Sequence, residues 1–99
     1  GVVMTFRPDT VEQETALRAV IDERRFQDEK WGPLFNGGSH TIGEWLLLIE
    51  DELIEAKRSL IKGGTGRDSV RSEIVQIAAL AVSCLEQHGT ADPHEKRQI

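Results

Sequence analysis

The sequence has only one cysteine, no long apolar run and fewer basic than acidic residues. Each of these shortages excludes a class of protein. Its single cysteine, Cys84, excludes an internal disulfide framework and suits a reducing compartment, so we expect a cytoplasmic protein. The longest purely apolar run covers residues 46–49, which is too short to cross a bilayer. No charged segment followed by an apolar stretch opens the chain, as it would in a secretory signal. We therefore expect no membrane partner.

Charge and histidine placement exclude two further classes. The chain has 12 basic and 17 acidic residues and a net charge of −5, which argues against a general binder of nucleic-acid polymers. The three histidines, His40, His88 and His94, are too scattered for a zinc site. The glycine-rich residues 63–66 follow no strand and precede no Lys-Ser/Thr pair, so they predict a turn and not a P-loop.

Glycine and proline divide the 99 residues into three predicted helices. The helices are expected at residues 11–30, 42–62 and 69–88, within a single domain over residues 1–99. Residues 1–9 form an N-terminal arm and residues 89–99 a polar C-terminal tail. The predicted N-caps are Thr10, Thr41 with Glu44 in a capping box, and Asp68, and Gly63 is the predicted C-terminal glycine of the second helix.

Each predicted helix carries an apolar stripe at helical spacing, which indicates an all-α fold. The stripe of the second helix consists of Ile42, Trp45, Leu46, Ile49, Leu53, Ala56 and Leu60. The short link between the second and third helices predicts an antiparallel hairpin, with the first helix added to it. Three helices with this much apolar surface do not complete a bundle alone. We therefore expect a homodimer or homotetramer that completes a four-helix-type bundle.

Acidic residues on the predicted hairpin fall at matching heights. Glu52 and Glu55 are three residues apart on one helix face, as are Glu73 and Gln76 on the next. With the turn centred near Gly64, Glu55 lies level with Glu73, and Glu52 lies level with Gln76. Carboxylates brought together raise one another's pKa unless a cation joins them, and Mg²⁺ or Mn²⁺ prefers such oxygen ligands. The alternative is an ordinary solvated acidic face, because Glu is a good helix former.

Basic and aromatic residues near the predicted helix ends are candidate substrate contacts. Trp31 could stack on a base and Lys30 could meet a phosphate, or Trp31 could instead anchor the core. Lys57, at the end of the second helix, and Arg71, at the start of the third, could bind a polyphosphate. Their alternative role is to complement the charge at a helix end.

The acidic pattern resembles that of a known family. Asp51-Glu52-Leu-Ile-Glu55, followed after seventeen residues by Glu73-Ile-Val-Gln76, resembles the EExxE…ExxD signature of MazG-like nucleoside triphosphate pyrophosphohydrolases. The resemblance covers roughly residues 20–88. It departs from the signature where Gln76 replaces the last aspartate and where Asp51 replaces the first glutamate.

Lys30-Trp31-Gly32, before the second helix, resembles the compact phage and bacterial branch of that family. The resemblance implies hydrolysis of nucleoside triphosphates to monophosphates and pyrophosphate, with Mg²⁺ or Mn²⁺ as cofactor, in dimers or tetramers of helical bundles. Lys30 and Trp31 are then the implied phosphate and base contacts.

The same resemblance implies roles for the acids. Glu52, Glu55 and Glu73 would be catalytic metal ligands, and Asp51 would bind a second ion or orient water. Gln76 would be a weaker ligand, since an amide oxygen brings no negative charge. Two other interpretations remain: a non-catalytic helical oligomerisation or adaptor module, and a nucleotide-binding relative that has lost turnover through Gln76.

Overall fold

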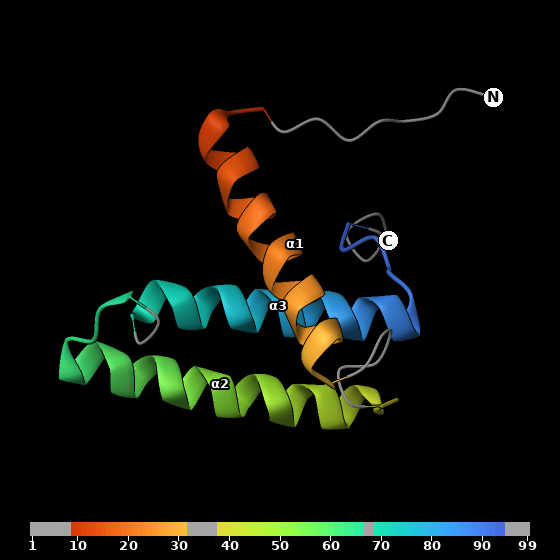
Figure 1. Ribbon diagram of the computed structural model, residues 1–99. Coiled ribbons are helices and arrows are strands. Elements are labelled where there is room, and N and C mark those ends of the chain that lie inside the picture. Colours follow the sequence, from red (N-terminus) through yellow and green to blue (C-terminus); the bar gives the residue numbers. More distant parts are fainter. Residues whose placement is uncertain (1–8, 32–37, 67–68, 95–99) are drawn as a thin grey trace.

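The computed structural model describes residues 9–31, 38–66 and 69–94, and these form three helices and no strand. They are α1 (Val11–Trp31), α2 (Ile42–Lys62) and α3 (Val70–His88) (Figure 1). The predicted bounds are confirmed to within one residue at each end. The N-terminal arm up to residue 8, the break after Trp31, Asp68 and the last five residues of the tail lie outside the described residues. No helix in the described ranges has the length and apolar character needed to cross a membrane.

Capping side chains fix where α1 and α2 begin. Thr10 Oγ1 accepts a hydrogen bond from the Gln13 backbone N–H at 3.0 Å, as predicted. Thr41 and Glu44 form the predicted capping box: Thr41 Oγ1 accepts from the Glu44 N–H at 3.1 Å, and Glu44 Oε1 accepts from the Thr41 N–H at 2.8 Å. The bond from the Thr41 backbone lowers the pKa of Glu44.

Between α2 and α3, the structure confirms the predicted glycine at the end of α2 but has a different N-cap for α3 from the one predicted. Gly63 ends α2 in the left-handed conformation, with φ of 66°, which glycine adopts without steric cost. The N-cap of α3 is Ser69 and not the predicted Asp68. Ser69 Oγ accepts from the Ser72 N–H at 3.1 Å, so the hydroxyl supplies the cap that a carboxylate was expected to supply.

The α2 and α3 helices lie side by side and antiparallel, and α1 crosses α3 steeply (Figure 1). The α3 helix therefore packs against both neighbours, and the buried apolar residues gather along it: Trp45, Ala56, Ala79 and Leu80. The first turns of α1, residues 11–18, lie beyond the hairpin and are exposed. This arrangement confirms the all-helical class and the predicted hairpin.

Polar contacts attach α1 and the segment before α2 to α3. Arg24, on α1, is buried and forms ion pairs with Asp28 and with Glu86 of α3. The Gln87 amide oxygen accepts from Trp45 Nε1 at 2.9 Å and from the His40 backbone N–H at 3.1 Å. These two bonds fix the segment before α2 against the end of α3.

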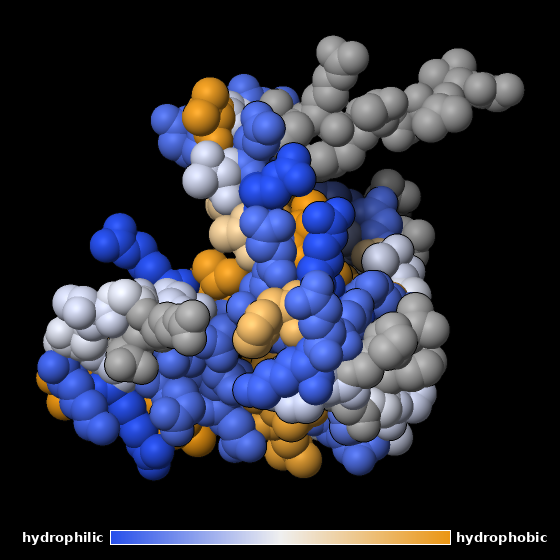
Figure 2. All heavy atoms as spheres, viewed as in Figure 1, coloured by the Kyte–Doolittle hydropathy of each residue, from blue (hydrophilic) through white to orange (hydrophobic). Residues whose placement is uncertain are grey.

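The apolar stripe predicted for α2 is divided between two faces. Trp45 and Ala56 are buried against α3, and Ile49 is partly buried. Leu46 and Leu60, by contrast, are more than half exposed. Figure 2 shows apolar side chains at the surface along the lower edge of the molecule, where α2 lies. Only part of the stripe is therefore used within one chain.

Candidate functional site

The predicted acidic residues of α2 and α3 meet at Glu52 and Glu73. The two side chains interact across the hairpin, and this interaction favours the protonated form of Glu52. Partial burial, the bond to Glu73 and the nearby charges of Glu73, Glu55 and Asp51 raise the pKa of Glu52 from 4.5 to about 7. Four predicted acidic site residues thus act on one another electrostatically.

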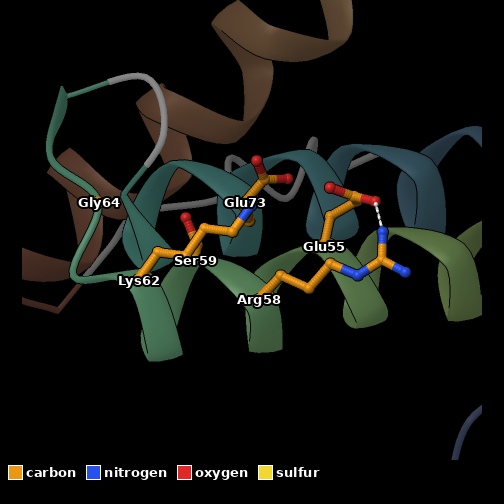
Figure 3. A pocket seen from close by; sticks show the side chains of 6 residues that line it. All are labelled: Glu55, Arg58, Ser59, Lys62, Gly64 and Glu73. Carbon is orange, nitrogen blue, oxygen red and sulfur yellow. Dashed lines mark hydrogen bonds and ion pairs between the residues drawn. The ribbon is translucent and has the colours of Figure 1, made fainter.

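Glu55 and Glu73 line a pocket of about 400 Å³ on one side of the hairpin (Figure 3). The two carboxylates rise from neighbouring helices toward the same side. Arg58 and Lys62 also line this pocket, and Arg58 donates to Glu55 Oε1 at 3.1 Å. The pocket therefore combines acidic groups able to hold a cation with basic groups able to hold an anion.

Asp51 and Glu52 line a second pocket, of about 410 Å³, at the other end of the acidic cluster. Its remaining walls are mainly aromatic and aliphatic: Trp31, His40, Trp45, Leu48 and Leu80. The rings of His40 and Trp45 meet edge to face, with their centroids 4.9 Å apart. Glu52 consequently connects the two pockets, since it lines this one and bonds to Glu73 of the other.

His40 and Trp45 are site residues that the sequence reasoning did not select. It named His40 only among the three histidines too scattered for a zinc site, and it placed Trp45 in the apolar stripe of the second helix. The available signal was their position: His40 precedes the N-cap Thr41, and Trp45 lies in the first turns of α2, so the cap places both rings at the same end of the helix.

Gln76 lies on the side of α3 that faces α1. It was expected level with Glu52, and it lines a third pocket, of about 530 Å³, between α1 and α3. Lys30 and Trp31 line the same pocket, and Lys30 Nζ lies 4.7 Å from the centre of a Trp31 ring. Trp31 is thus shared between this pocket and the aromatic one.

The two other predicted phosphate contacts are separated from each other. Arg71 lines a small pocket of about 280 Å³ at the hairpin turn, together with Gly63 and Ser69. Lys57 is exposed on the part of α2 that faces away from α3. The structure therefore places Arg71 near the acidic pocket, which shares Gly64 with the turn pocket, but does not place Lys57 there.

The acidic cluster is suited to a hard cation by its chemistry. Its donors are all carboxylate oxygens, which Mg²⁺ and Mn²⁺ prefer, and burial together with the neighbouring negative charges raises the pKa of Glu52. Within residues 9–31, 38–66 and 69–94, no three His, Cys, Asp or Glu side chains already surround a single point. A cation would therefore require Glu55 to turn from Arg58 toward Glu52 and Glu73.

Comparisons with protein families, curated proteins and solved structures found no match for this chain.

Proposed function

We propose that the protein hydrolyses nucleoside triphosphates to monophosphates and pyrophosphate with the help of Mg²⁺ or Mn²⁺. The observation that carries this proposal is the contact between the Glu52 and Glu73 carboxyls, beside Glu55. Carboxyl groups that lie close together disfavour one another's ionised form, and a bound cation relieves that repulsion. The MazG-like acidic pattern of the sequence supports the same assignment.

The acidic and basic residues of the cluster would have different roles in hydrolysis. Glu52, Glu55 and Glu73 would hold the cation, which when bound neutralises phosphate oxygens and lowers the pKa of a water molecule. Asp51, on the wall of the neighbouring pocket, would accept the proton of the attacking water on a carboxylate oxygen. Arg58 would then be free to bind the departing pyrophosphate.

The aromatic pocket would receive the nucleobase. Trp31, His40 and Trp45 offer ring faces and edges, and base–aromatic stacking contributes about 1–3 kcal/mol per base. Lys30, which the resemblance implied as a phosphate contact, lies beside Trp31 at the base end in this arrangement. Because Glu52 lines the aromatic pocket and interacts with Glu73 of the acidic one, a nucleotide lying along the hairpin would have its base at one end of the cluster and its phosphates at the other.

The proposal is tested by pyrophosphate release from a panel of standard and modified (deoxy)nucleoside triphosphates in Mg²⁺, Mn²⁺ or EDTA. We expect release that depends on the cation and is strongest for one base. Glu55→Gln should reduce it by about 10²-fold or more, because a charged ligand is lost while the helix stays intact. Glu29→Gln, an exposed site on α1, is the matched control and should leave the rate unchanged. Full activity of Glu55→Gln would contradict the assignment.

A nucleotide-binding protein without turnover is the second candidate, and the position of Gln76 favours it. The glutamine supplies no charge and lines the pocket facing α1, not the pocket that Glu55 and Glu73 line. Thermal stabilisation by nucleotide and Mg²⁺ without pyrophosphate release would support this candidate. Absence of any effect of cation or nucleotide on thermal stability would point instead to a helical oligomerisation or adaptor module.

A further inference from the structure

The face of α2 turned away from α3 carries large apolar side chains in two columns. Each column repeats every seven residues, so its members lie on the same side of the helix. Their exposed fractions range from 41% to 85%. The columns consist of Leu46, Leu53 and Leu60, and of Leu47, Ile54 and Ile61. We call this surface the outer face of α2. Since α1 packs on α3, no described segment covers it.

Two residues of opposite charge, Glu50 and Lys57, lie within the outer face. Both are exposed, and they are seven residues apart, about 10 Å along the helix, which is too far for them to pair with each other. Their helical neighbours three and four residues away are all apolar. No ion pair of either residue is found among the described residues. A Glu and a Lys set among leucines and isoleucines indicate a binding partner that carries the opposite charges at the matching positions.

The outer face is complementary to itself. Glu50 and Lys57 are equally far from the point midway between Leu53 and Ile54. A two-fold axis through that point, perpendicular to α2, brings Glu50 opposite Lys57 of the partner subunit and Lys57 opposite Glu50 of the partner subunit. The same operation places each apolar residue of one column opposite an apolar residue of the other. A parallel pairing would instead oppose like charges.

We propose that a second copy of this chain docks on the outer face of α2, antiparallel, with two Glu50–Lys57 ion pairs across the interface. The charge pattern selects this occupant over others. A lipid surface disfavours a glutamate in the middle of an apolar face, whereas a symmetric copy supplies a lysine at that point. The inference rests on α2 alone and holds whether or not the protein hydrolyses nucleotides.

Sedimentation equilibrium of the full chain tests the interface. We expect wild-type dimers. Glu50→Lys or Lys57→Glu alone should raise the dimer dissociation constant by about tenfold or more, because each creates two like-charge contacts. The double variant with both substitutions should return close to the wild-type value, since the pairs re-form with reversed sign. Glu29→Lys and Arg18→Glu make the same charge changes on exposed positions of α1 and should leave the constant unchanged.

Mixing the two single variants gives a second readout. Their heterodimer restores both opposite-charge pairs, so the mixture should dimerise more tightly than either variant alone. A monomeric wild type, a dimer insensitive to the single substitutions, or a double variant as weak as the single ones would each overturn the proposal. Far-UV circular dichroism confirms that each variant is helical. Pyrophosphate release, measured separately, distinguishes failure of the interface from failure of the proposed activity.

Discussion

At the residue scale, Glu52 is partly buried between α2 and α3, with its carboxyl bonded to that of Glu73. Burial and neighbouring negative charge both favour its protonated form. In an unfolded chain neither influence remains, and the pKa of Glu52 returns to about 4.5. The difference between the two states makes Glu52 a source of pH-dependent stability.

The sign of that dependence follows from proton binding. Below about pH 4.5 the carboxyl is protonated in both states, whereas between pH 4.5 and 7 only the folded chain keeps the proton. The contribution of Glu52 to the free energy of unfolding therefore falls as the pH rises through this window. At pH 8, we expect Glu52→Gln to be more stable than wild type by about 1 kcal/mol, a value discounted because the group is partly exposed.

Thermal unfolding at pH 4.5 and pH 8, without divalent cations, checks this expectation. The gain in Tm of Glu52→Gln should be present at pH 8 and largely absent at pH 4.5. Glu29→Gln, which removes an exposed carboxylate of α1, should show no such difference. A Glu52→Gln variant less stable than wild type at pH 8 would show that the charged carboxylate is stabilising, contrary to the raised pKa.

The sequence predicted that acidic residues of α2 and α3 lie close together, but it predicted less well which residues surround them. Helical spacing placed Glu55 level with Glu73 and Glu52 level with Gln76, whereas in the structure Glu52 interacts with Glu73. The sequence did not show that Gln76 would face α1, because α3 contacts two helices. An apolar pattern on most sides of α3 does not say which residues face α1 and which face α2.

At the element scale, the helix bounds were predictable because local chemistry determines them. Thr10, Thr41 and Gly63 act within a few residues of their own position, so no knowledge of the fold was needed. The cap of α3 was harder, since Asp68 and Ser69 are adjacent and both suit the role. The apolar stripe of α2 was predicted as one surface because residue types alone do not separate a face buried in the chain from one left uncovered.

The capping box of α2 should contribute measurably to stability. Thr41→Ala removes the hydroxyl that accepts from the Glu44 N–H, and we expect a loss of about 1 kcal/mol. The N-terminal end of α2 also carries Trp45, so fraying there should loosen its bond to Gln87. Urea unfolding followed by tryptophan fluorescence measures both effects. Thr90→Ala, beyond the end of α3, is the control, and an equal loss in that variant would contradict the capping role.

At the scale of the whole molecule, one chain leaves much of its apolar surface in contact with solvent. Large side chains of all three helices are exposed, among them Phe26 and Trp31 on α1 and Leu60 and Ile61 on α2. A small chain with so little enclosed core gains less from folding alone than a larger one does. The composition predicted this shortage, but not which face would remain uncovered, since that depends on α1 lying across α3.

The proposed interface would couple folding to association, so stability should depend on protein concentration. If a second copy covers the outer face of α2, a hundredfold rise in concentration favours the folded dimer by about 2.7 kcal/mol and raises Tm by roughly 5 °C. Calorimetry over that concentration range provides the measurement. Glu50→Lys should unfold at a lower temperature than wild type wherever the wild type is dimeric, because reaching the same Tm requires a concentration higher by the ratio of the two dissociation constants. A wild-type Tm that stays constant over the whole range would mean that the single chain is stable with its apolar face uncovered.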